Sequence, residues 1–346
     1  MPGQKSIHTV ICGTIHQETI INHLNRVSFN RPGGGLLYAA AGHALFDKNV
    51  GLVAKTNPDF MEEFYKDLEK LNADLKGIST TIRPINAMHY YRIVSRDKWE
   101  TTNFKRHLYE LGYEVPKFLL RNENQIENHS YSQQAEDLPL TSSDFPLEYA
   151  GAKAILLTPL NYLAHFSCIP FLRNMGLQKI LMRSSPAYMV PGKLINLPKL
   201  LNGVDFFFTT EQEIRTLFKA RLDSYRTMLE TLKKFGAVYF IIKNKEDGYL
   251  LMNAENQQLC LIPDYPVYTV DPIGEYDCFC GTFTACLSME NLSLEDCAAN
   301  ASAAASVCRE DSGIAYILNT YPPIFRLRAE LVAHDITYST ISSITD

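Results

Sequence analysis

The segment between residues 270 and 283 holds the strongest candidate for chemistry. A strand expected at 267–270 ends at Asp271 and Pro272, and a helix begins near Asp277. The N-terminus of a helix presents free backbone N–H groups, which suit a phosphate. An aspartate at that point can accept a proton from an attacking hydroxyl. The alternative for Asp277 is a plain helix N-cap, a position where Asp is among the preferred residues.

This segment resembles the motif D-[TP]-x-G-A-G-D-x-F-x-G of the ribokinase/PfkB family of sugar and nucleoside kinases. The residues that match are Asp271, Gly274, Asp277, Phe279 and Gly281. Four weaker similarities occur in the same order along the chain as in the family. They are a glycine pair with the helix after it at 34–40, an acidic segment at 204–213, a Lys-Gly hairpin at 241–249, and an Ala-rich helix with its glycine at 298–313. The resemblance covers residues 8–335.

The resemblance implies a ribokinase-like α/β fold, with a central, mainly parallel sheet flanked by helices and a small β lid over the acceptor site. It implies ATP and Mg²⁺ as cofactors. Asp277 would be the general base, and the backbone of Gly274, Glu275 and Tyr276 would form an anion hole for the transferred phosphoryl group. Glu213 would organise Mg²⁺ through water. The resemblance also places nucleotide-binding and substrate-binding residues: Lys243, Gly248 and Gly313, and His16, Glu18, Gly34, Gly35 and Tyr38.

The sequence departs from the family pattern at the expected phosphate site. The motif's Gly-Ala-Gly-Asp is Gly274-Glu275-Tyr276-Asp277 here, and the asparagine expected before Glu213 is Thr210. Tyr276 gives up glycine's conformational freedom. A Glu275 carboxylate ~4 Å from a phosphate charge would be repelled by ~4 kcal/mol at an effective dielectric constant of 20. An outward Glu275 would escape most of that penalty.

Two classes of function therefore remain open. One is an active kinase with a changed acceptor, transferring phosphate to a hydroxyl of a sugar, nucleoside or related small molecule. The other is a ribokinase-like pseudokinase that binds a ligand or a protein. A Rossmann-type enzyme is disfavoured, because no G-x-G-x-x-G follows a strand with an acidic residue further on.

Several other side chains have a functional and a structural interpretation. His16 and Glu18 follow the first expected strand, where open α/β sheets bind ligands, although His16 also suits a loop histidine bonded to backbone. Arg183 could meet an anionic substrate, but a surface salt bridge is favoured. The aromatic residues at 89–91 could cover a substrate ring or pack within the lid. We expect Trp99 to be a half-exposed packing residue.

Alternating apolar runs and helical segments predict the scaffold that positions these residues. Buried strands are expected at 11–13, 50–54, 154–157, 179–182, 204–209 and 238–243, with a hairpin partner at 249–252. Helices are expected at 36–46, 161–175, 211–219, 223–235 and 293–307. This alternation is typical of βαβ units with a parallel sheet. We expect one domain over residues 1–346, with 16–31 and 83–97 forming the lid and 122–147 a surface loop.

Composition narrows the partners. The chain of 346 residues is 46% hydrophobic and 21% charged, and its net charge is −5. No basic excess supplies the electrostatic attraction that nucleic-acid binding needs, and no apolar run approaches the ~18–20 residues of a membrane span. The 8 cysteines form no metal-binding pattern and are expected to be free thiols. We expect a cytoplasmic protein that binds a small-molecule substrate and forms a homodimer through the lid.

Overall fold

The main sheet of the protein has 10 strands in the order β14-β13-β12-β11-β10-β9-β8-β1-β4-β5. The structure is a computed structural model and describes residues 6–81, 88–127, 140–244, 248–289 and 291–344. The strands from β11 to β5 are parallel, and β12, β13 and β14 continue the sheet antiparallel at one edge. The strands are β1 (Thr9–Cys12), β4 (Val50–Thr56), β5 (Asp74–Thr80), β8 (Ala154–Leu157), β9 (Lys179–Arg183), β10 (Phe206–Thr210), β11 (Tyr239–Lys243), β12 (Tyr249–Asn253), β13 (Gln258–Ile262) and β14 (Thr337–Thr340).

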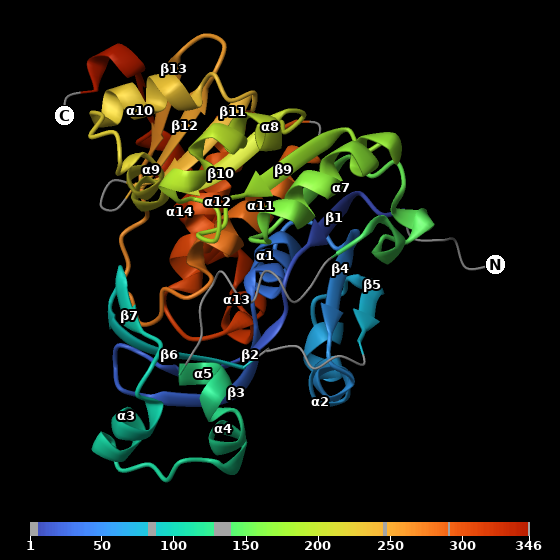
Figure 1. The fold of residues 1–346 in the computed structure, drawn as a ribbon, viewed down its shortest axis with the longest axis vertical. Coiled ribbons are helices and arrows are strands. Elements are labelled where there is room, and N and C mark those ends of the chain that lie inside the picture. The colour runs from blue at the N-terminus through green and yellow to red at the C-terminus, as the bar shows by residue number, and fades with distance from the viewer. Residues whose placement is uncertain (1–5, 82–87, 128–139, 245–247, 290, 345–346) are drawn as a thin grey trace.

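Helices cover both faces of this sheet (Figure 1). One layer contains α7 (Tyr162–Asn174), α8 (Leu197–Leu201), α9 (Glu211–Phe218) and α10 (Tyr225–Leu232). The other contains α1 (Gly35–Ala44), α2 (Pro58–Glu69), α11 (Glu275–Leu287), α12 (Leu294–Cys308), α13 (Ile314–Leu318) and α14 (Pro322–His334). Short 3-10 helices are Ser142–Asp144, Leu147–Tyr149, Pro191–Asn196 and Ile341–Ser343. Because successive strand residues face opposite sides, Phe206 and Phe208 pack in the second layer and Phe207 in the first.

A second sheet lies at one end of the main sheet, in the order β3-β2-β6-β7 (Figure 1). Its strands are β2 (His16–Ile21), β3 (Val27–Gly33), β6 (Met88–Ser95) and β7 (Lys98–Glu100). The helices α3 (Phe104–Glu110), α4 (Lys117–Arg121) and α5 (Glu123–Glu127) cover one of its faces, burying Phe104, Leu108, Leu119 and Ile126 against it. The segments 16–31 and 83–97, expected to form a lid, contribute to this sheet, although 82–87 lie outside the described residues.

Close packing of α1 against α11 explains one glycine of the kinase-like motif. A Cβ atom on Gly281 would stand 1.9 Å from the carbonyl oxygen of Ala39, and one on Gly42 would stand 2.4 Å from the carbonyl oxygen of Cys278. No side chain fits at either position, since carbon atoms in contact normally stay about 3.5–4.0 Å apart. Gly281 therefore brings the two helices together, and their N-termini reach the same region.

The α/β class with a mainly parallel sheet flanked by helices is confirmed, and so are the free thiols, since all eight cysteines are buried and unpaired. The strand expected at 267–270 is wrong: no strand is formed there. Pro263, Pro266 and Pro272 surround this segment, and proline cannot donate to a sheet ladder. The expected surface loop at 122–147 contains α5 and the buried residues Leu140 and Phe145, while 128–139 lie outside the described residues. Among the described helices, none has the length and apolar character to cross a membrane.

Candidate active site

A cavity of about 1060 Å³ lies at the carboxyl ends of the parallel strands, between the main and second sheets. This is the edge where open α/β sheets bind ligands. The main sheet contributes Arg183 from β9 and Lys243 from β11, and the second sheet contributes Tyr91 and Trp99. Asp277 lines the cavity from the start of α11. The architecture thus brings together residues that are distant in the sequence.

Asp277 is a carboxylate with one buried oxygen at the start of α11. Its side chain lies beside the first residue of α1, where a Cβ on Gly35 would stand 3.3 Å from Asp277 Oδ1. Oδ1 is buried and has no hydrogen-bond partner among the described residues. Burial raises the pKa of Asp277 to about 6, although the nearby charges of Arg183 and Lys243 oppose the shift. A carboxylate with this pKa is ionised at neutral pH and is a stronger base than an ordinary aspartate.

The first turn of α11 supplies the N–H groups for the expected anion hole. Gly274 is its N-cap with φ of 78°, a left-handed conformation that glycine adopts at little cost. The N–H of Glu275 donates to the carbonyl of Pro272 at 3.2 Å and is already used. The N–H groups of Tyr276 and Asp277 come next in the first turn, which has no intrahelical acceptors. The backbone therefore retains two donors for an anion.

The Glu275 side chain is buried in an ion-pair network instead of facing Asp277. Oε2 is 2.8 Å from Lys243 Nζ, while Oε1 is 2.7 Å from Arg96 and 3.2 Å from Arg309. Arg96 and Arg309 also contact Asp264, at 2.6 and 2.5 Å. Burial alone would raise the pKa of Glu275, but Lys243, Arg309 and Arg96 lower it to about 2. Three cations meet two carboxylates, so the network carries one excess positive charge, and the repulsion expected from Glu275 is neutralised.

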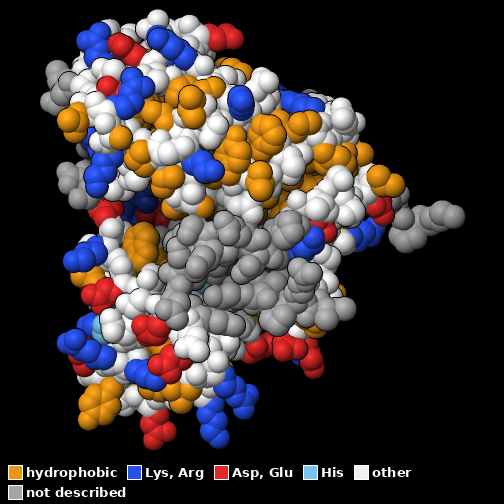
Figure 2. All heavy atoms as spheres, in the orientation of Figure 1, with side chains coloured by type: hydrophobic (Ala, Val, Ile, Leu, Met, Phe, Trp, Pro, Cys, Tyr) orange, Lys and Arg blue, Asp and Glu red, His pale blue; other side chains and the backbone are white. Residues whose placement is uncertain are grey.

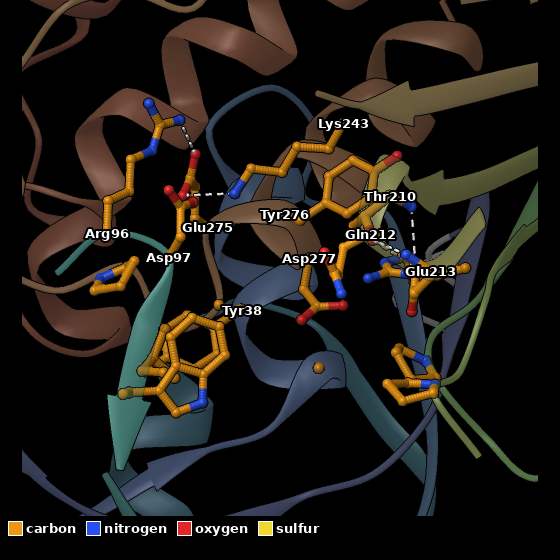
Figure 3. A pocket seen from close by; sticks show the side chains of 18 of the residues that line it. Tyr38, Arg96, Asp97, Thr210, Gln212, Glu213, Lys243, Glu275, Tyr276 and Asp277 are labelled. Atoms are coloured by element: carbon orange, nitrogen blue, oxygen red, sulfur yellow. Dashed lines mark hydrogen bonds and ion pairs between the residues drawn. The ribbon is translucent and has the colours of Figure 1, made fainter. Parts of the chain in front are cut away.

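Tyr276 points into the core. Its hydroxyl donates to the carbonyl of Ile241 at 2.7 Å, and its ring packs against Phe208, Tyr249 and Phe279. Figure 3 shows Glu275 directed toward Arg96 and Lys243 and Tyr276 lying between Lys243 and Thr210, while Asp277 extends away from both. Neither substitution therefore places a side chain over Asp277.

Glu213 is held at the start of α9 by three donors at the ends of two strands, β9 and β10. Its carboxylate accepts from Arg183 at 2.8 Å, from Ser184 Oγ at 2.8 Å and from the Thr210 N–H at 2.9 Å. Thr210 replaces the family's asparagine as the N-cap and forms a capping box with Glu213. Arg183, expected in a surface salt bridge, is instead a buried partner of Glu213, because β9 ends beside α9.

These residues bear on where Mg²⁺ could bind. Among the described residues, no group of three or more His, Cys, Asp or Glu could hold a metal ion. Magnesium usually keeps several waters and binds substrate phosphates with one or two carboxylates. Glu213 lines the cavity, and its contact with such an ion through water stays a prediction.

Glu18 and Tyr38 are hydrogen-bonded to each other in the wall of the cavity. Tyr38 OH donates to Glu18 Oε2 at 2.9 Å, and the Gly34 N–H donates to Oε1 at 2.9 Å. A Cβ on Gly33 would overlap the carboxylate, at 2.0 Å from Cδ. Burial raises the pKa of Glu18 to about 8, although the bonds from Tyr38 and Gly34 oppose the shift. Both side chains line the cavity, together with Gly34 and Gly35.

The other expected residues are divided between the cavity and its surroundings. His16 lines the cavity and stacks on His89 with ring centroids 3.8 Å apart. Of the residues expected to bind nucleotide, Lys243 lines the cavity, but Gly248 and Gly313 are not among its lining residues. Gly248 has φ of 93°, and its α-carbon approaches the carbonyl of Ile262. Gly313 has φ of 87° at the start of α13, beside Arg31.

Sequence reasoning missed Arg96 and Arg309 and gave Trp99 only a packing role. Trp99 lines the cavity from β7. Arg309 directly follows the Ala-rich helix α12 and is 1% exposed, which is unusual for arginine without a partner. The available signal was the run Arg96-Asp97-Lys98-Trp99, a charged turn with an aromatic residue in a segment assigned to the lid.

Comparisons with known proteins show which family and fold this chain resembles. Residues 173–320 match the family model described as pfkB family carbohydrate kinase. A cytidine kinase from Thermococcus kodakarensis is 23% identical over 290 residues, covering 83% of this chain and 91% of that protein. A fructokinase structure from Vibrio cholerae, with fructose, ADP and potassium bound, matches with a TM-score of 0.67 at 13% identity over 94% of this chain and 99% of the other. A putative ribokinase II from E. coli in complex with ATP and Mg²⁺ matches with a TM-score of 0.65 at 14% identity, covering 93% and 99%. The predicted resemblance is confirmed.

Proposed function

We propose, since the chain belongs to the ribokinase/PfkB family, that it transfers the terminal phosphoryl group of ATP to a hydroxyl group of a small molecule. The observation that carries this proposal is Asp277, a cavity-lining carboxylate at a helix N-terminus with an unpartnered Oδ1. An acceptor hydroxyl hydrogen-bonded to Oδ1 would lose its proton to Asp277 as it attacks phosphorus. The acceptor oxygen would form a bond to the γ-phosphorus of ATP as the bond from that phosphorus to the bridging oxygen breaks, so that ADP leaves.

The protein's contribution to the reaction is positioning and charge. The N–H groups of Tyr276 and Asp277 would face the transferred phosphoryl group, where one such donor contributes ~10²–10³-fold in rate. Lys243 and the excess positive charge around Glu275 would attract the phosphates. Magnesium bound to the phosphates would neutralise part of their charge. The second sheet would serve as a lid that excludes water.

A nucleoside is the first acceptor to test. The curated relative is named a cytidine kinase, and the acceptor end of the cavity has Tyr38, Tyr91 and Trp99 in its wall. Aromatic side chains stack on the flat face of a base, and each such contact is worth ~1–3 kcal/mol. The sealed Glu18–Tyr38 pair does not offer a free carboxylate to a sugar diol. We therefore expect nucleosides to be better acceptors than ribose or fructose.

The experiment is an ADP-release assay with Mg-ATP and a panel of nucleosides and sugars, with Asp277→Asn as the control. ADP release that depends on one acceptor and is lost in the variant supports the kinase. If no acceptor is phosphorylated while Mg-ATP or a nucleoside raises the thermal midpoint, the pseudokinase is the better account. The specific observation on its side is that Lys243 is already paired with Glu275.

A further inference from the structure

The hairpin of β6 and β7 ends against the segment that carries Asp277. Residues 95–98 form its turn, and Arg96 extends from this turn to the main body of the protein. One guanidinium nitrogen is 2.7 Å from Glu275 Oε1 and the other is 2.6 Å from Asp264 Oδ2. Figure 3 shows Arg96 reaching Glu275 from the opposite side to Lys243. Arg96 therefore joins the hairpin to two carboxylates of the main body that are far from it in the sequence.

The contact of Arg96 with the two carboxylates is largely shielded from water. The side chains of Arg96, Asp264 and Glu275 are 24%, 10% and 1% exposed. A bidentate arginine bridge fixes direction as well as distance, because the guanidinium is planar. Arg309, 1% exposed, touches the same two carboxylates from α12. Both acceptors of Arg96 thus have a second partner in the main body, and Arg96 ties the hairpin to it.

Two further contacts join the second sheet to the main body at other points. The His23 N–H donates to the Val270 carbonyl at 2.9 Å, and Arg31 donates to the Ser312 carbonyl. They involve β2, β3 and the turn between them, and their acceptors are backbone atoms. Ile273 also packs against the cluster of Ile20, Tyr91 and Ile93. The removal of Arg96 would therefore loosen the turn of the β6–β7 hairpin without detaching the second sheet.

We propose that Arg96 is a positioning residue that holds the β6–β7 hairpin closed over the cavity and fixes the start of α11. Glu275 is the first residue of α11 and lies two residues before Asp277. When Arg96 holds Glu275, it fixes the helix turn whose N–H groups and carboxylate would meet the phosphoryl group. This role rests on the proposed function above, since it assigns Arg96 to the kinase reaction.

The chain contains a spectroscopic probe for this closure. Trp99 is the single tryptophan in the sequence. It lies three residues after Arg96, lines the cavity and is 38% exposed. If the hairpin opens, the indole ring loses its neighbours across the cavity and becomes more accessible to water. Its emission and its quenching by acrylamide therefore report the hairpin position without any substrate.

The experiment compares wild type with Arg96→Ala, Arg96→Lys, Glu275→Gln and the control Arg92→Ala. Arg92 is on β6 and its partner is Glu110 at 3.4 Å, outside the network. We expect redder emission and stronger quenching in Arg96→Ala and in Glu275→Gln, which alters the contact from the other side. Arg96→Lys keeps the charge but cannot bridge both carboxylates, so an intermediate result is expected. Arg92→Ala should match wild type.

In the active enzyme, kcat/KM of Arg96→Ala should fall by roughly 10²-fold, the scale expected when catalytic groups are misplaced by about 1 Å. Circular dichroism checks that each variant is folded, and Arg96→Lys provides the comparison if Arg96→Ala is not. Wild-type emission and quenching in Arg96→Ala would overturn the closure, and wild-type kcat/KM would overturn the positioning role. If the wild type phosphorylates no acceptor while the emission still shifts, the proposed function fails and the closure by Arg96 stands.

Discussion

The Glu275 network allows a direct test of whether this residue blocks or supports the anion site. Glu275→Gln keeps the size of the side chain and removes its charge, which leaves Lys243, Arg96 and Arg309 with Asp264 as their remaining carboxylate in the network. Loss of one partner from a buried ion pair costs about 3–5 kcal/mol. The unfolding entropy of about 2.1 cal/mol/K per residue gives about 0.7 kcal/mol/K for 346 residues. We therefore expect the thermal midpoint to fall by roughly 4–7 °C.

The same variant should become more sensitive to anions. An anion that binds the folded state stabilises it by RT ln(1 + [L]/Kd), and the three cations around residue 275 would be freer to bind one. In a thermal-shift assay, sulfate and Mg-ATP should raise the midpoint more in Glu275→Gln than in wild type.

A matched control uses Glu148→Gln, whose partner Lys76 lies 3.4 Å away at the surface. Exposed ion pairs are screened by water and add little stability, so its midpoint should stay close to that of wild type. The reasoning fails if Glu275→Gln unfolds at the wild-type temperature, because the network would then store no stability. An equal anion response in Glu275→Gln and wild type would show that Glu275 does not compete with phosphate.

Three further outcomes follow from the site. Asp277→Asn should lose ~10²–10⁴-fold in turnover with an unchanged thermal midpoint. The kcat/KM of wild type should rise with pH up to about pH 6 and then level off, because the base becomes deprotonated. A flat pH profile would exclude Asp277 as the base. Tyr276→Phe should lower the free energy of unfolding by about 1 kcal/mol, because one hydrogen bond is lost. Tyr276→Gly should lower it by about 3–5 kcal/mol, because a cavity opens in the core. Equal values for the two variants in urea unfolding would contradict the placement of the ring in the core. Burial raises the pKa of Glu18 in the folded state to about 8, above the value of about 4.3 for an ordinary glutamate. The folded state therefore binds the extra proton, and its stability should fall by roughly 2–3 kcal/mol from pH 5 to pH 7. Glu18→Gln should remove that part of the slope in urea unfolding at both pH values.

Most of the fold could be predicted because its signals are local. The strands at 154–157, 179–183 and 206–210 are apolar runs, and the helices between them start at strong caps such as Thr210. The failure at 267–270 has a local cause too, since the apolar and aromatic run predicts a strand but the surrounding prolines prevent pairing. Backbone hydrogen bonding overrode side-chain preference there.

Several residues that line the cavity could be predicted from the sequence, but the side chains with which they form ion pairs could not. Asp277, Glu213 and Lys243 were found through motif positions, and each lines the cavity. The direction of Glu275 could not be inferred, because Arg96 lies 179 residues away in the chain. The negative charge of Glu275 is expected to repel a bound phosphate when only its neighbours in the sequence are considered. Its effect depends on cations that the fold brings in from β6, β11 and α12.

The same geometry explains how this kinase-like motif can lose a small residue and a glycine without losing its backbone function. The N–H groups of a first helical turn point along the helix axis toward the ligand, whereas the side chains project sideways. Positions 275 and 276 can therefore hold large side chains wherever the surroundings accept them, and here an ion-pair network accepts one and an aromatic core the other. Position 274 has no such freedom, because its φ is 78° and a Cβ there would stand 2.0 Å from the Tyr38 ring. The glycine that the backbone geometry requires is the one that is present, and Gly274→Ala should disrupt this turn more than any exchange at Glu275.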